Sequence, residues 1–276
     1  MLKAVEFFCG IGGTTNGLSR AGIAVKAGID NDPSCKETYE YNNPDSEFIQ
    51  ADIRDLSEDQ LAELIEIKRN DDSVIFVGCS PCHFWSKMNT NKEKSEQSKG
   101  LLQEFQRFVD WFRPGYVVIE NVPGLRYKEN EQVLSDFLSF LQETGYVCDG
   151  RVINAKLYGV PQNRYRYLLI ATRLTSSISL PKAEEDDSLI VENFIGIENG
   201  FETIEAGHKD RSEFMHTAAG LSEKNLKRIS RTKKNGGDRL DWKDDPELQL
   251  KAYEGKDDYF RDVYGRMWWK KPAPTI

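Results

Sequence analysis

Residues 5–13 read Val5-Glu6-Phe7-Phe8-Cys9-Gly10-Ile11-Gly12-Gly13, an apolar run that ends in a glycine-rich turn. The run predicts a buried strand over 5–8, and a helical pattern begins near Thr14. Glycines in such a turn let the backbone pass close to a ligand at the start of a helix. The spacing differs from the Gly-x-Gly-x-x-Gly of dinucleotide-binding proteins, and tight strand-to-helix turns also need glycine for structural reasons.

Strand and helix patterns alternate outward from this unit over the first 172 residues. Further buried strands are predicted at 24–29, 48–51, 74–77, 116–119 and 167–171, and amphipathic helices at 57–68, 100–112 and 131–144. This alternation predicts an α/β fold with a mostly parallel, Rossmann-like sheet, helices on both faces and ligands at the carboxyl ends of the strands.

The texture changes after about residue 173. A Thr175-Ser176-Ser177 stretch and an acidic run at 184–187 resemble a linker, and the segment to about 262 is polar. We therefore predict two domains, 1–172 and 173–276, the second smaller and irregular. A basic cluster in the second domain indicates either a solvated face or a phosphate-contacting surface. Its members are Lys224, Lys227, Arg228, Arg231, Lys233, Lys234 and Arg239.

Composition sets the broad class of protein. The chain has 276 residues, 39% hydrophobic and 30% charged, with a net charge of −8, so it is not a uniformly basic nucleic-acid binder. No apolar run is long enough to cross a bilayer. Five cysteines without an export signal favour a reducing compartment, and we expect a cytoplasmic protein.

Two acidic residues strengthen the ligand interpretation of the glycine turn. Asp30 ends the second predicted strand, where an acid can receive ribose hydroxyls, and Asp52 follows the strand at 48–51. Aspartate also caps helices often. Three ligand-type features at three successive strand ends nevertheless favour a nucleoside pocket.

A second group of chemically active residues follows the strands at 74–77 and 116–119. Gly78-Cys79-Ser80-Pro81-Cys82 places a cysteine in a rigid loop at a strand end, which suits a nucleophile. The alternatives are a buried small side chain, a Cys79–Cys82 redox pair and, less favoured, a zinc site. Glu120 also ends a buried strand, which is costly unless it is paired or functional. Arginines in the segment 161–166 can supply its partner cation.

These motifs together resemble the DNA cytosine-5 methyltransferase family over the N-terminal 172 residues. The likeness rests on Phe8-Cys9-Gly10-Ile11-Gly12-Gly13, on Pro81-Cys82-x-x-x-Ser86, on Glu120-Asn121-Val122 and on Gln162-x-Arg164-x-Arg166, in the family's order. His83 departs from the usual glutamine after the nucleophile. Cys79 stands where small residues are common. Neither change removes a group that the chemistry demands.

The resemblance implies a DNA (cytosine-5-)-methyltransferase of a bacterial restriction–modification system. It implies S-adenosylmethionine as cofactor, double-stranded DNA as partner and a target cytosine flipped out of the helix. The implied catalytic residues are Cys82, Glu120, Arg164 and Arg166. The residues expected at the cofactor are Phe8, Gly10, Ile11, Gly12, Asp30, Asn31, Asp52, Ile53, Ser80 and Leu102.

The final residues Pro272-Ala273-Pro274-Thr275-Ile276 resemble the family segment that closes the target-recognition region. In single-chain members a helix-rich stretch and an Asn-containing cofactor motif follow it. Three explanations fit: one subunit of a split enzyme whose second polypeptide carries these motifs, a truncated form, or a frame-broken gene. Two other functions stay open: a catalytically silent DNA- or partner-binding remnant, and a tRNA cytosine-5 methyltransferase.

Overall fold

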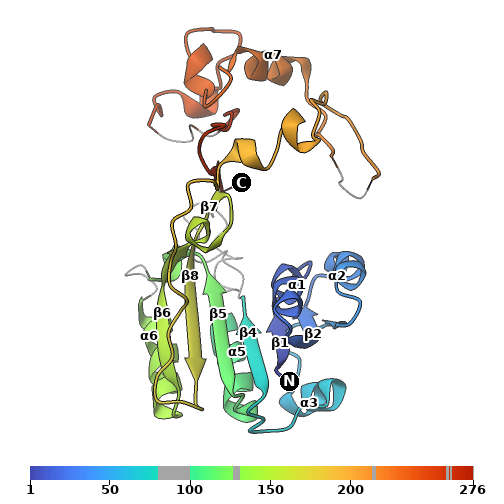
Figure 1. Cartoon of the computed structure of the whole chain (residues 1–276), viewed down its shortest axis with the longest axis vertical. Helices are drawn as coiled ribbons and strands as arrows, with labels where there is room; N and C mark the ends of the chain where they lie inside the picture. The colour runs from blue at the N-terminus through green and yellow to red at the C-terminus, as the bar shows by residue number, and fades with distance from the viewer. Residues whose placement is uncertain (80–99, 127–130, 213–215, 259–260, 262, 276) are drawn as a thin grey trace. The chain divides into compact units, whose positions relative to one another are not determined.

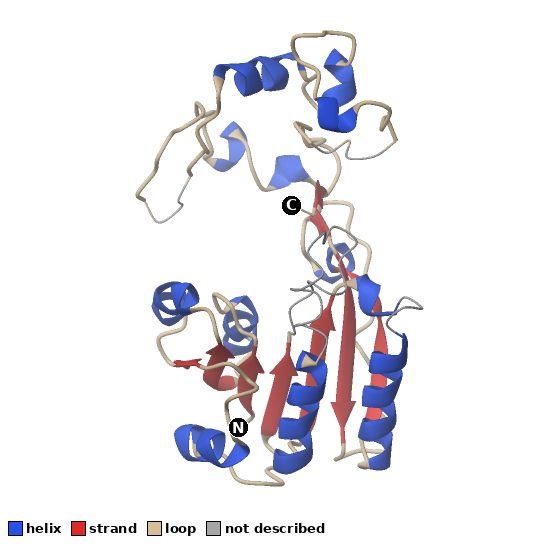
Figure 2. Cartoon of the chain, turned by 180° about the vertical axis from the view of Figure 1, so that it is seen from behind, coloured by secondary structure: helices blue, strands red, loops and turns tan. Residues whose placement is uncertain are grey.

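The computed structural model describes residues 1–79, 100–126, 131–212, 216–258, 261 and 263–275 (Figures 1 and 2). They form two compact units. Unit 1 comprises Met1–Ile153 and Tyr165–Lys182, and unit 2 comprises Asn154–Arg164 and Ala183–Ile276. Residues 154–164, which the sequence assigned to the first domain, thus pack with unit 2. A functional boundary at residue 172 stays a prediction.

Unit 1 is built on a seven-stranded sheet of order β3-β2-β1-β4-β5-β8-β6. Neighbours among β1 to β5 are parallel, and β8 runs antiparallel to β5, so the predicted mostly parallel sheet is confirmed. The strands are β1 (Lys3–Phe7), β2 (Ala24–Asp30), β3 (Glu47–Gln50), β4 (Val74–Gly78), β5 (Tyr116–Asn121), β6 (Val147–Asn154) and β8 (Tyr165–Thr172). The strand pattern had not predicted β6.

Helices pack on both faces of this sheet. On one face Phe7 of β1 contacts Phe105 and Phe108 of α5, with ring centroids 5.2 Å apart in each pair. On the other face Leu18 of α1 packs against an apolar cluster formed by β1, β2 and β4. The helices of unit 1 are α1 (Gly13–Arg20), α2 (Lys36–Asn42), α3 (Glu58–Ile65), α5 (Leu101–Phe112) and α6 (Glu131–Glu143), with 3-10 turns at Pro33–Cys35 and Pro123–Arg126.

The spacing of apolar residues explains why α5 forms and which side it buries. Its buried positions recur every three or four residues, the period of one helix face. They are Leu101, Leu102, Phe105, Phe108, Val109 and Phe112. The core of unit 1 lies between this stripe, α3, α6 and the sheet.

Unit 2 has little regular structure and a small core of its own. Its elements are α7 (Glu223–Arg231), the short strands β7 (Gln162–Asn163) and β9 (Ala273–Pro274), and 3-10 turns at Ala155–Tyr158, Val191–Asn193, Ile197–Asn199, Arg239–Trp242 and Lys251–Tyr253. β7 and β9 pair in parallel, so residues at the end of the chain join the segment after β6. Buried Trp242 and Leu248 lie around the guanidinium of Arg228, which donates to the carbonyl of Leu248 at 2.8 Å.

Among the described residues, no helix is long and apolar enough to span a membrane.

The ring of Tyr39 in α2 packs closely against Gly28 of β2 and Gly12 of the glycine turn. Its ring is fully buried, and its hydroxyl lies 2.7 Å from Ser46 Oγ and 3.0 Å from Thr15 Oγ1. A side-chain carbon added at Gly28 would lie 2.5 Å from this ring, and one at Gly12 would lie 2.7 Å from it. Both positions therefore require glycine for close approach.

We expect Gly28→Ala to destabilise the protein by about 1–3 kcal/mol, because the new methyl group overpacks the Tyr39 contact. Gly17→Ala is the matched control. Gly17 is exposed on α1 with no neighbouring atom within 4 Å of an added Cβ, so alanine should stabilise the helix by up to about 1 kcal/mol. Urea unfolding midpoints measure both effects. Equal shifts in the same direction would contradict the role assigned to Tyr39.

Candidate active site

The register of the parallel strands brings the predicted site residues to one edge of the sheet. Phe7 of β1 pairs with Ile29 of β2 and with Gly78 of β4, and Gly78 pairs with Ile119 of β5. The residues that follow this row therefore lie together at the carboxyl edge of the sheet, where ligands bind in such folds. They are Phe8, Asp30, Cys79 and Glu120.

The Asp30 carboxylate accepts a hydrogen bond that fixes the backbone of the glycine turn. Gly10 N donates to Asp30 Oδ2 at 2.8 Å, and Asp32 N donates to Asp30 Oδ1 at 3.0 Å. Gly10 and Gly12 have φ values of +50° and +84°, which glycine adopts at little cost. Phe8 has φ +62°, a conformation that non-glycine residues adopt mainly where the surrounding structure enforces it, as at binding sites.

A buried carboxylate that the sequence had not indicated anchors the start of α1. Glu6 is 1% exposed, and its Oε2 accepts from Thr15 N at 2.8 Å and from Thr15 Oγ1 at 2.5 Å. Burial raises the pKa of Glu6 although these hydrogen bonds oppose the shift. The glycine turn is thus fixed by Asp30 from one side and, through Thr15, by Glu6 from the other.

Asp52 is held by a bidentate contact with Arg54. Arg54 Nε donates to Asp52 Oδ1 at 2.9 Å, and Arg54 Nη2 donates to Asp52 Oδ2 at 2.8 Å. This hydrogen bonding is the main cause that lowers the pKa of Asp52, which therefore remains a carboxylate at neutral pH. Sequence reasoning missed Arg54. An arginine two residues after a candidate ligand acid was the available signal.

A small pocket of about 50 Å³ lies between the ends of β1, β2 and β3. Ligand pockets usually enclose several hundred cubic ångströms, so a whole cofactor would extend beyond it. Gly10 has open space where a side chain would stand, which leaves room over the turn. The pocket is lined by Phe7, Phe8, Ile29, Asp30, Asn31, Ala51, Asp52, Ile53, Arg54 and Leu101.

The other expected cofactor residues occupy varied places. Ile53 lines the pocket, and its carbonyl accepts from Arg107 Nη2 at 2.9 Å. Ile11 is exposed at the tip of the glycine turn. Leu102 is buried in the core, while its neighbour Leu101 lines the pocket. Ser80 lies outside the described residues.

Glu120 and Arg166 form an ion pair at the same edge of the sheet. Arg166 Nε lies 3.0 Å from Glu120 Oε1, and Arg166 Nη1 donates to the carbonyl of Tyr165 at 2.8 Å. The Glu120 side chain is 37% exposed, so the pair can meet a ligand. The next residue, Asn121, is buried and accepts from Val122 N at 2.8 Å, which fixes the turn after β5.

The structure does not place the other two expected catalytic residues, Arg164 and Cys82, beside this ion pair. Arg164 belongs to unit 2, where its amide donates to Asn154 Oδ1 at 3.1 Å. Cys82, the expected nucleophile, lies outside the described residues, as does His83. The structure thus brings together Glu120 with Arg166 and Gly10 with Asp30.

Cys79 is poorly suited to thiol chemistry. Its sulfur lies 3.8 Å from Thr14 Oγ1, and burial, with Glu6 and Glu120 nearby, raises its pKa to about 12. The thiolate is the reactive form of cysteine, and at neutral pH this residue is protonated. A Cys79–Cys82 redox pair is therefore disfavoured.

The residues present fit S-adenosylmethionine in chemical type. Two carboxylates, Asp30 and Asp52, offer acceptors for hydroxyl and amine groups, and Phe8, Ile53 and Leu101 offer apolar walls. Positive φ values at Gly10 and Gly12 let the turn lie close to a bound group.

Solved structures with the same fold are methyltransferases. A prophage-encoded protein of E. coli, described as a DNA modification methyltransferase, superposes with a TM-score of 0.68 at 21% identity and covers 100% of this chain and 82% of its own. DNMT2 of Spodoptera frugiperda has a TM-score of 0.58 at 19% identity over 85% of this chain and 66% of its own. The fold is that of S-adenosylmethionine-dependent methyltransferases, as the sequence predicted.

Sequence comparison then identifies the family. The model of the C-5 cytosine-specific DNA methylase family matches residues 2–257. The Type II methylase M.HgiDII of Herpetosiphon aurantiacus is 36% identical over 99% of this chain and 74% of its own length. The Type II methyltransferase M1.HphI of Haemophilus parahaemolyticus is 29% identical over 87% of this chain. The chain therefore belongs to the C-5 cytosine-specific DNA methylase family.

The family match and the Type II relatives confirm the family, the enzyme class and the methyl donor that the sequence predicted. The chain spans 63% of the length of M1.HphI, 65% of M1.BsuMI of Bacillus subtilis and 40% of M.XorII of Xanthomonas oryzae. It thus matches only part of the length of each of these curated relatives.

Proposed function

We propose that the protein is a site-specific methyltransferase of a restriction–modification system, acting in the bacterial cytoplasm on carbon 5 of cytosine in duplex DNA through a covalent Cys82 adduct. The observation that carries this proposal is the Glu120–Arg166 ion pair, which stands at the same sheet edge as the cofactor-type turn. Family membership and the Type II relatives support DNA as substrate.

The chemistry divides among a nucleophile, a carboxyl group and its partner cation. The Cys82 thiolate adds to carbon 6 of the ring, which makes carbon 5 nucleophilic. Glu120 accepts a hydrogen bond from the exocyclic amine and shares a proton with ring nitrogen 3, where negative charge develops as the thiolate adds. Bound S-adenosylmethionine supplies the methyl group that carbon 5 accepts. Solvent then accepts the proton from carbon 5, and the electron pair that it leaves re-forms the ring double bond as the bond from carbon 6 to Cys82 breaks.

Arg166 serves this chemistry by position. Its Nε holds Oε1 of Glu120 and thereby fixes the orientation of the carboxyl group that meets the base. The target cytosine must leave the stacked duplex to reach these groups. An intact ion pair favours an active enzyme over a silent remnant, since a charged pair at a ligand edge has little structural use.

Trapping tests the covalent step. When the further segment of a relative is supplied, duplex DNA carrying 5-fluorocytosine should form a denaturation-resistant adduct with the chain, because fluorine at carbon 5 prevents the proton loss that releases the cysteine. Cys82→Ser should abolish both the adduct and methylation while cofactor and DNA binding remain, since a hydroxyl is a far weaker nucleophile than a thiolate. Cys79→Ser is the matched control and should still form the adduct. An adduct on the Cys82→Ser variant would assign the nucleophile elsewhere.

A second polypeptide segment is part of the proposal. Opposite side chains of β5 and β8, Val118 and Ile170, are only half-buried, as is Leu168. In the described part of the chain, Leu18 of α1 is the one helical residue packed against the apolar cluster that includes Val118. Partly uncovered apolar surface of this kind suits a partner. The part of these relatives that this chain does not match is the proposed cover.

The yield of trapped adduct, measured with and without this segment, tests whether the segment is needed. We expect the chain alone to give little adduct and the chain mixed with the part of M.HgiDII that it does not match to give more, because a partner that binds the competent fold increases its population. Full adduct yield from the chain alone would contradict the need for a second segment and leave the nucleophile assignment intact.

Duplex DNA contact is proposed for one side of α7. Of the seven basic residues in this part of the chain, Arg228 and Arg239 are buried, and Lys233 pairs with Asp241 at 3.1 Å. Lys224, Lys227 and Arg231 are exposed at spacings of three and four residues. Like charges at these spacings repel one another, so phosphate binding gives them a purpose that helix stability does not.

Salt dependence measures this contact. Each of Lys227→Gln and Arg231→Gln should weaken duplex binding and reduce the slope of log affinity against log salt by about 0.9, the value for one released counterion. Lys68→Gln is the control. This exposed lysine precedes β4 and therefore lies at the amino edge of the sheet, opposite the edge that carries Asp30 and Glu120. Slopes that equal the control's for both α7 variants would remove α7 from the DNA contact.

A further inference from the structure

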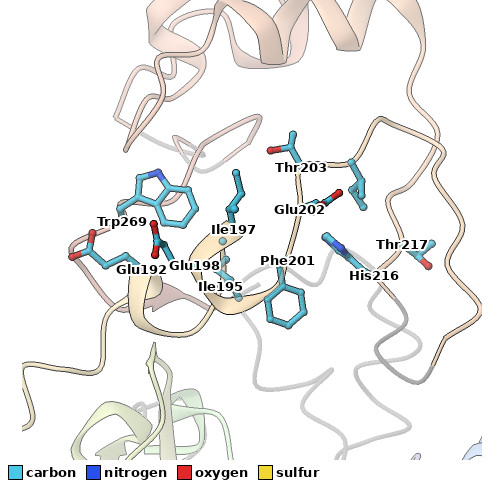
Figure 3. Close-up of a pocket in the computed structure, with 12 residues that line it drawn as sticks. Glu192, Ile195, Ile197, Glu198, Phe201, Glu202, Thr203, His216, Thr217 and Trp269 are labelled. Atoms are coloured by element: carbon cyan, nitrogen blue, oxygen red, sulfur yellow. The ribbon is translucent and has the colours of Figure 1, made fainter.

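Unit 2 carries a groove that neither the sequence nor the methylation chemistry had indicated (Figure 3). It encloses about 670 Å³, within the range of ligand-binding pockets. Its walls come from the loop around the 3-10 turn Ile197–Asn199, from the segment near His216 and from Trp269 near the end of the chain. We call it the acidic groove, defined by Glu192, Ile197, Glu198, Phe201, Glu202 and Trp269.

Hydrogen bonds within unit 2 hold the walls in place. Glu192 N donates to the carbonyl of Trp269 at 3.0 Å, and Trp269 N donates to Asn235 Oδ1 at 2.9 Å. Asn199 Nδ2 donates to the carbonyl of Glu192 at 2.9 Å. The rings of Phe201 and His216 pack edge to face, with their centroids 5.6 Å apart. A preformed groove loses less entropy on binding than a loop that must first order.

The groove presents large apolar side chains to solvent. Ile197 is 74% exposed and Trp269 is 43% exposed. Figure 3 shows Ile197 between Trp269 and Phe201. Clustered exposure of this kind is typical of binding surfaces, whereas single exposed apolar residues are ordinary.

The charge of the groove selects the class of partner. Glu192, Glu198 and Glu202 line it, no lysine or arginine does, and these three carboxylates have no ion-pair partner among the residues the structure describes. Such a surface repels phosphates and attracts cations. It therefore differs from the exposed cations of α7 in the chemistry that it can bind.

We propose that the acidic groove docks a protein segment in which lysine or arginine residues flank a large apolar side chain. The apolar side chain would enter against Ile197, Phe201 and Trp269, and the flanking cations would meet the three glutamates. An apolar anchor with a charged rim is the usual anatomy of a protein interface. This inference does not depend on the methylation mechanism.

Two labelled peptides test the proposal on the full 276-residue chain. One consists of three Arg-Leu-Trp-Arg repeats, and its twin has glutamate in place of each arginine. Fluorescence anisotropy should show saturable binding of the cationic peptide, weaker at higher salt, and no binding of the acidic twin. Failure of the cationic peptide to bind, or equal binding of both, would overturn the proposal.

Variants locate the binding. Glu192→Gln, Glu198→Gln and Glu202→Gln combined should weaken the cationic peptide roughly tenfold, and Ile197→Ser should do so by a similar factor or more. Ile197 is exposed enough that its replacement should leave the fold intact. Glu247→Gln, an exposed glutamate elsewhere in unit 2, is the matched control and should change nothing. Unchanged affinity in both groove variants would place the peptide elsewhere.

Two further measurements on the same variants exclude other occupants. Duplex DNA affinity should be unchanged or slightly higher in the triple glutamine variant, and a loss equal to that of the peptide would make the groove part of the DNA surface. Sedimentation of the wild-type chain should give the same oligomeric state as Ile197→Ser. Self-association that Ile197→Ser abolishes would identify a second copy as the occupant and contradict the proposal.

Discussion

Parallel pairing of β1 with β2 and β4, and of β4 with β5, is the constraint on which the candidate site depends. It aligns the four strands in one row, so that Phe8, Asp30, Cys79 and Glu120 follow that row at one edge of the sheet. The glycine turn is then fixed from two sides, by Asp30 at Gly10 and by buried Glu6 at Thr15. A shift of one residue in this register would turn each side chain to the opposite face and separate the site.

The second unit uses its charges in a different way. Arg228 and Arg239 lie inside it, where the Arg228 guanidinium bonds backbone carbonyls and stacks near Trp242 and Tyr264. Two residues of the basic cluster thus serve the fold of this small unit. The cations of α7 and the carboxylates of the acidic groove instead lie on the surface of unit 2, where they can bind other molecules. An acidic protein can present a cationic helix to phosphates and a separate anionic groove to another partner.

Much of unit 1 was predictable from the spacing of its apolar residues, because buried strands and amphipathic helices have distinct apolar periods. The position of Asp30, Asp52 and Glu120 at strand ends indicated that they lie near a ligand-binding edge of the sheet. Glu6, Arg54 and Tyr39 were not foreseen, because their roles come from contacts between elements and not from local pattern. β6 escaped because its apolar alternation is interrupted by Asp149, Gly150 and Arg151. In unit 2 a run of basic residues could not show which guanidinium groups turn inward.

Hydrogen–deuterium exchange with S-adenosylhomocysteine, the demethylated form of the cofactor, tests whether the carboxyl edge of the sheet binds the cofactor. Saturating ligand should slow exchange in three separate segments, near residues 8–15, 30–32 and 51–54, and leave exchange in α7 unchanged. These segments are distant in sequence and meet only at the carboxyl edge of the sheet. Ligand binding without protection in these segments would contradict the assignment of this edge as the cofactor site.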